Sequence, residues 1–379
     1  MKIAVNTRLL LHGRLEGIGW VSYEILSRIT KAHPEHQFYF LFDRKYSDEF
    51  VFSDNVTPVV VHPQSRLPVL WYLFFEWGIP HAVRKIQADL LVSPDGWTSL
   101  RAKIPKLTVF HDLNFEYYPQ FMPKRNLRYV RHYVPKYAEQ SDRIIAVSQF
   151  TKDDIVKLYN VDSEKIDVVY NAANPIYKPL SEAERTSVRN KYSEGCEYFL
   201  FVGSLHKRKN LINMLMAYDK FKEHDQNNVK MLIVGTKMWR RPDFEDTYNA
   251  MKHKDDVKFI GYLSSEELSK VMASSLALTY VSVFEGFGIP IVEAFESDTA
   301  VITSNTSSMP EIAGDAALLV DPFSIDDIAE TMEKVAVNPE LRKSLIEKGR
   351  VRRKMFNWDK SADEFWKIIE KMIKNHNYE

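Results

Sequence analysis

Short apolar runs alternate with amphipathic helical patterns along the whole chain, and this alternation constrains the fold more than any other feature of the sequence. Continuous apolar strands separated by helices are typical of parallel sheets that helices cover on both faces. Runs that predict strands lie at 3–5, 38–42, 59–61, 90–92, 107–110, 144–147 and 166–169, then at 199–202, 231–234, 259–260, 276–280, 301–303 and 318–320. These strands are too many for one sheet, so we predict two doubly wound α/β domains.

A segment of small residues with a proline, Asn-Ala-Ala-Asn-Pro at 171–175, predicts the boundary between the two domains. The first domain is expected to span residues 1–172 and the second residues 173–357. In open parallel sheets, ligands bind beyond the carboxyl ends of the strands. Two Rossmann-like domains that face each other would therefore hold a ligand in the cleft between them.

The composition argues against several classes of protein. Lysine plus arginine and aspartate plus glutamate both number 51, so no global field attracts nucleic acid or a membrane. The single cysteine, Cys196, excludes an intramolecular disulfide and fits a reducing compartment. The chain opens on a predicted strand and not on a signal peptide, and no apolar run is as long as a transmembrane helix. We expect a soluble, cytoplasmic protein.

The stretch 284–293, Phe-Glu-Gly-Phe-Gly-Ile-Pro-Ile-Val-Glu, links the strand predicted at 276–280 to a predicted helix. Gly286 and Gly288 permit a tight turn and a close approach of the backbone to a ligand. Pro290 suits the first helical position, where its missing N–H costs nothing. Because free N–H groups at a helix start favour phosphate, the turn predicts an anion site.

Two carboxylates, Glu285 and Glu293, flank this predicted anion site. A site that combines phosphate-binding N–H groups with two acids suits a ligand that is both phosphate and polyol, and a sugar nucleotide is such a ligand. The alternative is structural, because an acid in a first helical turn is common for macrodipole reasons and glycine-rich turns occur in many α/β proteins.

A basic loop, Gly203-Ser204-Leu205-His206-Lys207-Arg208-Lys209-Asn210, follows the strand predicted at 199–202. Its cations suit a diphosphate, because arginine offers a planar fork of donors and lysine a point charge. The alternative is a solvated basic turn. A further strand end, Gly261-Tyr262-Leu263-Ser264, precedes a helix that Ser264 or Ser265 would cap, and its backbone groups could read the edge of a base.

Two features of the first half also fall at strand ends. His111-Asp112 ends the strand at 107–110, so the histidine should point toward a ligand, with Asp112 able to orient it; a structural hydrogen bond is the commoner explanation. Glycines at 13, 17 and 19 precede a helix predicted at 20–30. Their spacing is not the dinucleotide fingerprint, which disfavours a NAD enzyme, and a plain flexible loop is the alternative.

Two segments combine apolar and basic character. Residues 123–142 predict a basic amphipathic helix, which is either a solvated face or a contact with an anionic acceptor or membrane surface. Residues 71–77, Trp-Tyr-Leu-Phe-Phe-Glu-Trp, are unusually aromatic. Core packing between the domains is the first explanation for them, and contact with an acceptor or lipid is the second.

Together these pieces resemble the retaining GT-B glycosyltransferases of the large family that includes bacterial mannosyl-, glucosyl- and N-acetylglucosaminyltransferases. The resemblance covers essentially the whole chain, and its most specific part is the Glu-x₇-Glu motif from Glu285 to Glu293. Supporting motifs are Gly17-Ile18-Gly19, His111-Asp112, Val147-Ser148-Gln149-Phe150-Thr151, Arg208-Lys209-Asn210 and Ser308-Met309-Pro310-Glu311-Ile312-Ala313-Gly314.

The resemblance implies a role for each matching position. Glu285 would bind hydroxyls of the donor sugar, Glu293 the ribose, and Arg208 with Lys209 the diphosphate of the leaving group. His111 would contact the donor sugar near the reacting carbon. The further donor contacts it implies are Gly17, Gly19, Gly203, Ser204, Tyr262, Leu263, Phe287, Gly288 and Ile289. Residues 358–379 resemble the last helix of the family, which completes the first domain.

One departure concerns the diphosphate. Many members of the family have Gly-Arg where this chain has Gly203-Ser204. Arg208 and Lys209 would therefore be the cationic side chains that bind the diphosphate. The branch with Arg-Lys-Asn contains many GDP-mannose users, which favours mannose as the sugar. The sequence has no Asp-x-Asp, so we expect neither a bridging metal nor a cofactor.

The resemblance thus implies a retaining hexosyltransferase that acts on a saccharide or lipid-linked acceptor in cell-surface polysaccharide biosynthesis, with possible peripheral contact at the inner membrane face. A UDP-sugar-dependent glucosyl- or N-acetylglucosaminyltransferase is the alternative. A sugar-nucleotide epimerase, a glycosyl phosphorylase and a non-catalytic nucleotide-binding protein are more distant alternatives.

Overall fold

The computed structural model describes residues 1–13, 15, 17–235 and 242–376, and the chain forms two compact units. Unit 1 comprises Met1–Asn171 and Trp358–Glu379, and unit 2 comprises Ala172–Asn357. Along the described part of the chain, the helices fall short of the length and apolar character needed to cross a membrane.

Unit 1 contains a 7-stranded parallel sheet in the order β3-β2-β1-β4-β5-β6-β7. Its strands are β1 (Lys2–Asn6), β2 (Gln37–Phe42), β3 (Val56–Val60), β4 (Leu90–Ser93), β5 (Lys106–Phe110), β6 (Arg143–Ala146) and β7 (Ile166–Val168). Its helices are α1 (Ile18–Ala32), η1 (Asp48–Phe50), α2 (Pro68–Leu73), η2 (Phe74–Gly78), α3 (Ile79–Ile86), α4 (Asn114–Tyr117), η3 (Pro119–Phe121), α5 (Lys124–Gln140), α6 (Gln149–Tyr159), η4 (Ser163–Lys165) and α15 (Trp358–His376).

Unit 2 contains a 6-stranded parallel sheet in the order β10-β9-β8-β11-β12-β13. Its strands are β8 (Tyr198–Val202), β9 (Lys230–Val234), β10 (Val257–Gly261), β11 (Ala277–Tyr280), β12 (Ala300–Ser304) and β13 (Leu318–Val320). Its helices are α7 (Glu182–Ser193), η5 (Lys207–Lys209), α8 (Leu211–Lys222), α9 (Pro242–Ala250), η6 (Lys254–Asp256), α10 (Ser265–Ser274), α11 (Ile289–Glu296), α12 (Met309–Ala313), α13 (Ile325–Val337), α14 (Pro339–Arg352) and η7 (Arg353–Met355).

The prediction of two doubly wound α/β domains is confirmed, because each apolar run forms a strand of a parallel sheet. The strands read as continuous apolar runs because helices cover both faces of each sheet, so alternate residues are equally buried. In β5 and β12, for example, every residue is buried. The aromatic segment 71–77 supplies Phe74 and Phe75 to the core of unit 1, so its packing lies within one unit.

Two predicted helix starts are wrong by one or two residues. Helix α1 begins at Ile18, so Gly19 lies in its first turn and not in the preceding loop. A Cβ atom at Gly19 would lie 2.6 Å from the carbonyl oxygen of Leu9, so close packing against this backbone requires glycine there. Helix α11 begins at Ile289, which makes Pro290 its second residue.

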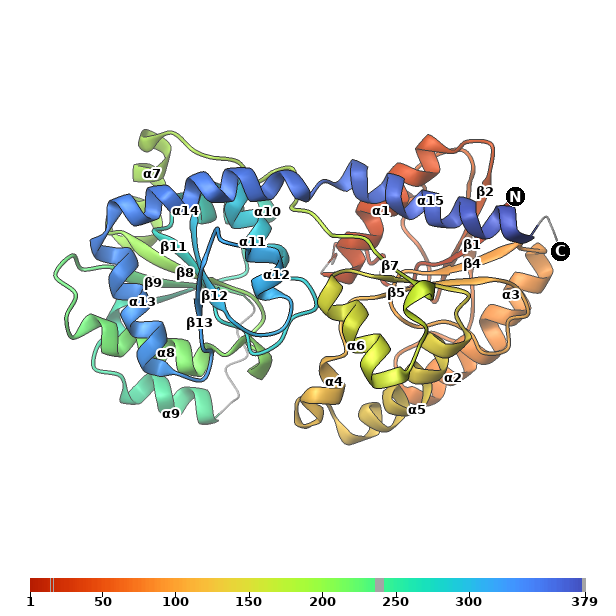
Figure 1. Cartoon of the computed structure of the whole chain (residues 1–379), viewed down its shortest axis with the longest axis horizontal. Helices are drawn as coiled ribbons and strands as arrows, with labels where there is room; N and C mark the ends of the chain where they lie inside the picture. Colours follow the sequence, from red (N-terminus) through yellow and green to blue (C-terminus); the bar gives the residue numbers. More distant parts are fainter. Residues whose placement is uncertain (14, 16, 236–241, 377–379) are drawn as a thin grey trace. The chain divides into compact units, whose positions relative to one another are not determined.

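Helix α15 packs on α1 although the two lie more than three hundred residues apart in the sequence (Figure 1). Arg28 Nε donates to Asp359 Oδ1 at 2.6 Å, and Ser361 Oγ donates to the carbonyl oxygen of Tyr170 at 2.6 Å. The ring of His33 stacks on that of Trp366 with centroids 3.7 Å apart. Residues 377–379 of the predicted final helix lie outside the described residues.

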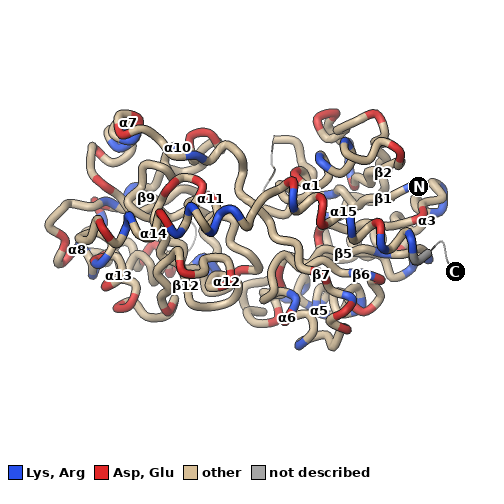
Figure 2. The backbone as a smooth tube through the Cα atoms, turned by 45° about the horizontal axis from the view of Figure 1, so that its top comes forward, with Lys and Arg blue, Asp and Glu red and all other residues tan. Residues whose placement is uncertain are grey.

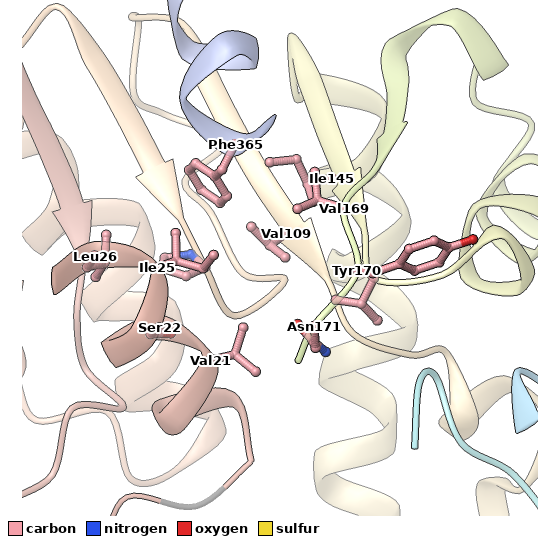
Figure 3. A pocket seen from close by; sticks show the side chains of 12 residues that line it. Val21, Ser22, Ile25, Leu26, Val109, Ile145, Val169, Tyr170, Asn171 and Phe365 are labelled. Atoms are coloured by element: carbon pink, nitrogen blue, oxygen red, sulfur yellow. The ribbon is translucent and has the colours of Figure 1, made fainter. Parts of the chain in front are cut away.

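A small apolar cavity marks the inner face of α15. Figure 3 shows Phe365 of α15, Val109 and Ile145 of the sheet, and Val21 and Ile25 of α1 around it. Its volume is about 20 Å³, which is room for little more than one water molecule. The cavity is therefore a packing gap under α15 and not a ligand site.

Replacing Trp366 with alanine is expected to lower the free energy of unfolding by about 3–5 kcal/mol, because the lost indole leaves a cavity between α15 and α1. Urea denaturation followed by circular dichroism measures this loss. Lys371→Ala, on the exposed face of the same helix, should change stability by less than about 0.5 kcal/mol. Equal midpoints for the two variants would contradict the packing of α15 on α1.

Candidate active site

The order of the strands in unit 2 places two of the predicted loops side by side. Strands β8 and β11 are neighbours, with Phe199 opposite Ala277 and Leu200 opposite Leu278, and the direction of chain progress reverses between them. Ligands of doubly wound sheets bind at such a switch point, beyond the carboxyl ends of the strands. The loop after β8 carries Arg208 and Lys209, and the loop after β11 carries Glu285.

These three side chains form one ionic cluster. Lys209 Nζ lies 2.7 Å from Glu285 Oε1, and Arg208 Nη1 pairs with Glu285 Oε2. Lys209 Nζ also donates to the hydroxyl of Tyr280 at 2.7 Å, and Arg208 Nη1 donates to the carbonyl oxygen of Phe284 at 2.8 Å. The carboxylate is therefore held through both oxygens, and the cluster keeps one net positive charge.

The burial of Glu285 makes this cluster a strong electrostatic feature. Burial alone would raise the pKa of its carboxyl group, but the charges of Lys209 and Arg208 outweigh that effect and lower the pKa to about 2. Glu285 is thus ionised at any physiological pH. The same environment raises the pKa of Tyr280 well above its usual value, first through burial and then through the charge of Glu285, so its hydroxyl stays protonated.

Hydrogen bonds from the loop after β12 hold the glycine-rich turn in place. The amide of Glu285 donates to Ser307 Oγ at 3.0 Å. Ser308 Oγ lies 2.9 Å from the carbonyl oxygen of Glu285 and 3.0 Å from that of Phe287. Gly288, the residue before α11, has a φ of 106°, which disfavours any other residue. The turn therefore presents the start of α11, at Ile289, in a fixed position.

Gly203 and Ser204 begin the basic loop. Gly203 has a φ of 147°, and a Cβ atom there would lie 3.6 Å from the side chain of Lys209. The loop thus passes close beside Lys209, and Val283 N donates to the carbonyl oxygen of Arg208 at 2.9 Å, which ties the two loops together through their backbones.

Glu293 belongs to a second polar contact, separate from the ionic cluster. Burial raises its pKa to about 7, although a hydrogen bond with the Tyr177 side chain lowers it in part. Tyr177 is buried and lies in the segment before α7, where the sequence offers only Pro-Ile-Tyr-Lys-Pro and no recognisable motif. The sequence analysis did not identify it.

The predicted contacts for the base lie after β10. Ser264 caps α10, as predicted, by accepting from the amide of Glu267. The side chain of Tyr262 is 76% exposed, so it is available to a ligand and is not part of the core. Leu263 follows it in the same connection between β10 and α10.

The remaining predicted residues belong to unit 1. His111 follows β5, and its Nε2 atom lies 2.7 Å from the carbonyl oxygen of Pro94. This carbonyl, and not Asp112, orients the ring, because Asp112 accepts from the amide of Asn114 at 3.0 Å. Burial lowers the pKa of His111, so the ring is neutral and its Nδ1 atom is an acceptor. Gly17 directly precedes α1, with a φ of 42°.

The switch point of unit 1 carries an ion pair that the sequence analysis missed. Arg8 Nε lies 2.5 Å from Asp95 Oδ2, and Asn6 Nδ2 donates to Asp95 Oδ1 at 2.9 Å. The guanidinium of Arg8 also lies over the ring of Trp97, 4.7 Å from its centroid. The sequence could have pointed to these residues only through their position, because Asn6 is the last residue of β1 and Asp95 comes two residues after β4.

Histidine, cysteine, aspartate and glutamate side chains in residues 1–13, 15, 17–235 and 242–376 do not gather in a group of three or more that could hold a metal ion. Metal independence itself stays a prediction, to be tested with a chelator.

Comparison with known proteins assigns this geometry to a family. Residues 183–352 match the model of "Glycosyl transferases group 1", and residues 15–175 match that of "Glycosyltransferase Family 4". The chain is 31% identical over 259 residues to O-antigen chain mannosyltransferase RfbU of Salmonella typhimurium, which covers 68% of each protein. It is 25% identical over 370 residues to O-antigen chain mannosyltransferase B of Escherichia coli, covering 95% of this chain and 97% of that protein.

Solved structures agree in fold. Sucrose-phosphate synthase from Thermosynechococcus elongatus superposes with a TM-score of 0.79 at 17% identity, over 99% of both chains. Likeness at this identity shows the fold alone, which is GT-B. The matches to relatives and family models cover both units, and the switch point of unit 2 carries the Glu-x₇-Glu motif predicted from the sequence. The chain therefore belongs to the group 1 glycosyltransferases and is a glycosyltransferase.

Proposed function

We propose that the protein is a retaining hexosyltransferase that takes mannose from GDP-mannose. The observation that carries the proposal is the ionic cluster of Glu285, Arg208 and Lys209 at the switch point of unit 2. The names of the two relatives, both O-antigen mannosyltransferases, support mannose as the sugar and cell-surface polysaccharide as the product.

The cluster suits a nucleoside diphosphate as leaving group. Its net positive charge lies beside the start of α11, and cations together with free helix N–H groups stabilise a diphosphate that gains charge in the transition state. In this proposal Arg208 and Lys209 bind the diphosphate, and the backbone of Phe287, Gly288 and Ile289 lies near the sugar and phosphates. Glu285 contacts the sugar hydroxyls.

Other predicted residues take the remaining parts of the donor. The carboxylate of Glu293 binds the ribose, and the connection at Tyr262 and Leu263 contacts the base. In unit 1, His111 offers Nδ1 to the donor sugar, and Gly17 begins the helix α1 whose N-terminus attracts phosphate. Gly203 and Ser204 begin the loop that carries both cations, and the φ of 147° at Gly203 favours glycine there.

The proposed reaction proceeds on one face of the sugar. The bond from the anomeric carbon to the phosphate oxygen breaks, and the electron pair leaves with GDP. The acceptor hydroxyl oxygen bonds to the anomeric carbon, and its proton moves to the leaving phosphate oxygen. Double displacement would instead need a free carboxylate as nucleophile, whereas Glu285 is bound by two cations.

The acceptor is proposed to be a saccharide or lipid-linked saccharide, which the chain would meet by peripheral contact with the inner membrane face. A UDP-sugar in place of GDP-mannose is the alternative donor, and the nucleotide experiment separates the two.

GDP is expected to raise the melting temperature, while UDP and ADP should have little effect, because a ligand that binds only the native state stabilises it. Thermal-shift titrations with each nucleotide and its common sugar conjugates, in magnesium and in EDTA, measure this. Equal shifts in both media would support metal-independent binding. A shift with UDP alone would overturn the choice of GDP-mannose, and no shift with any nucleotide would overturn the proposed function.

Two lysine variants test whether the GDP-induced rise in melting temperature comes from binding at the ionic cluster. Lys209→Ala should abolish most of it, because Lys209 lies in the ionic cluster. Lys207→Ala should keep it, because Lys207 points to Asp243, with an ion pair at 3.3 Å, and its side chain is 55% exposed.

GDP affinity should rise as the pH passes upward through about 7, because the carboxylate form of Glu293 accepts hydrogen bonds from both ribose hydroxyls. Isothermal titration with GDP across this range, on wild type and Glu293→Gln, checks the assignment. The glutamine variant should bind more weakly at high pH and lose this pH dependence, apart from the titration of GDP itself. The same pH profile in both proteins would contradict the role of Glu293.

A further inference from the structure

Unit 1 carries an exposed apolar stripe that no core residue covers within the described chain. Val69, Leu73 and Trp77 recur every fourth residue along α2 and η2, a spacing that places side chains on one face of a helix. They are 60%, 37% and 57% exposed. Phe74 and Phe75, on the opposite face, are buried in the core. The segment therefore presents large apolar side chains on both faces, although only one face is needed for folding.

Basic side chains line the helix beside this stripe. Helix α5 packs against α2, and Arg125, Arg128 and His132, at spacings of three and four, lie along one of its faces. Figure 2 marks lysine and arginine positions of the backbone in blue, including those of α5. Residues 124–138 include no acidic residue. In the described chain, no carboxylate lies within ion-pair distance of Arg125 or Arg128.

A groove joins the apolar stripe to the basic helix. It encloses about 460 Å³, and its lining combines apolar, aromatic and basic side chains. The lining residues are Pro68, Val69, Tyr72, Arg125, Arg128, Tyr129, His132 and Tyr133. No acid lines it, so the groove complements an anionic group that is attached to something apolar.

Acidic side chains near the groove are already bound. Glu76, in the same segment as the stripe, is buried and accepts hydrogen bonds from the amides of Leu100 and Arg101 at 3.2 Å each. Glu116 pairs with Arg131 of α5 at 3.1 Å. Neither carboxylate neutralises the cations that line the groove.

Closely packed aromatic rings form the floor of the groove. Tyr129 packs on Trp71 and Trp97, with ring centroids 5.3 Å and 5.4 Å apart, and Tyr133 lies 4.4 Å from Tyr129. Tyr129 is almost wholly buried. An incoming group would therefore meet a floor of packed aromatic rings, with the exposed side chains of Arg125 and Arg128 beside it.

We propose that this surface, formed by Val69, Leu73, Trp77, Arg125 and Arg128 and here named the α2–α5 surface, docks the protein on an anionic lipid bilayer. The apolar stripe would enter the headgroup region, where tryptophan is favoured, and the arginines would bind lipid phosphates. The choice of a membrane as partner rests on the proposed function, in which the acceptor is lipid-linked, but the surface is inferred from its own shape and charge.

Cosedimentation with vesicles tests this docking without donor or acceptor. Wild type is expected to bind vesicles of equimolar phosphatidylcholine and phosphatidylglycerol, to bind pure phosphatidylcholine much more weakly, and to be released by salt. The double variant Arg125→Glu, Arg128→Glu should lose about tenfold or more in vesicle affinity. Val69→Ser with Trp77→Ser, both on exposed positions, should weaken binding to both kinds of vesicle.

A matched charge reversal on another face provides the control. Lys367 and Lys371 are exposed on α15, which lies against α1 on the other side of the sheet from α5 (Figure 1). Lys367→Glu with Lys371→Glu changes the net charge equally and should bind vesicles nearly as wild type does. Equal losses of vesicle affinity in the two double variants would overturn the proposal that the α2–α5 surface docks on the bilayer. Failure of the wild type to bind anionic vesicles would also overturn it.

Folding and donor binding are checked separately, by the circular dichroism spectrum and the GDP-induced thermal shift of each variant. A variant that loses vesicle binding but keeps its spectrum supports the docking surface whether or not GDP binds. Failure of every nucleotide to bind would overturn the proposed function and leave the vesicle result standing.

Discussion

The buried carboxylate of Glu285, held between Lys209 and Arg208, is the interaction on which the arrangement of the site depends. Removing a carboxylate from water is costly unless opposite charges replace its solvation. Here two cations do so, and the lowered pKa of Glu285 shows that their attraction exceeds the cost of burial. The cluster in turn fixes both cations beside the start of α11, where they are positioned before any ligand arrives.

The sheet order explains why these charges meet. In both units the first three strands are added from the centre of the sheet toward one edge, and the next strand then pairs with the first and begins the other half of the sheet. The loops after these two central strands are therefore neighbours. In unit 2 these loops carry Lys209 and Glu285, and in unit 1 they carry Arg8 and Asp95. The same topology therefore places an ion pair at the carboxyl end of each sheet, with residues that are distant in sequence.

Much of this could be predicted from the sequence because the strands are buried on both faces and read as uninterrupted apolar runs. The loops that form the site could be predicted because glycines and charged residues follow the apolar runs. The role of Tyr280 could not be predicted, because it is the last residue of an apolar strand and its sequence context is that of a core residue. Only the structure shows that its hydroxyl accepts a hydrogen bond from Lys209. Tyr177 and Asp95 lie in segments without a local pattern, and only the fold gives them partners. Gly19 illustrates a packing contact that no local rule reveals.

The central claim is that Glu285 positions cations for a diphosphate, and titration of GDP into Glu285→Gln tests it most directly. The glutamine removes a negative charge, so attraction by net charge alone would strengthen GDP binding. If the carboxylate instead holds Lys209 and Arg208 in position, GDP affinity should fall by about tenfold, which is the loss of about 1.4 kcal/mol. Affinity that is unchanged or higher in the variant would contradict the account.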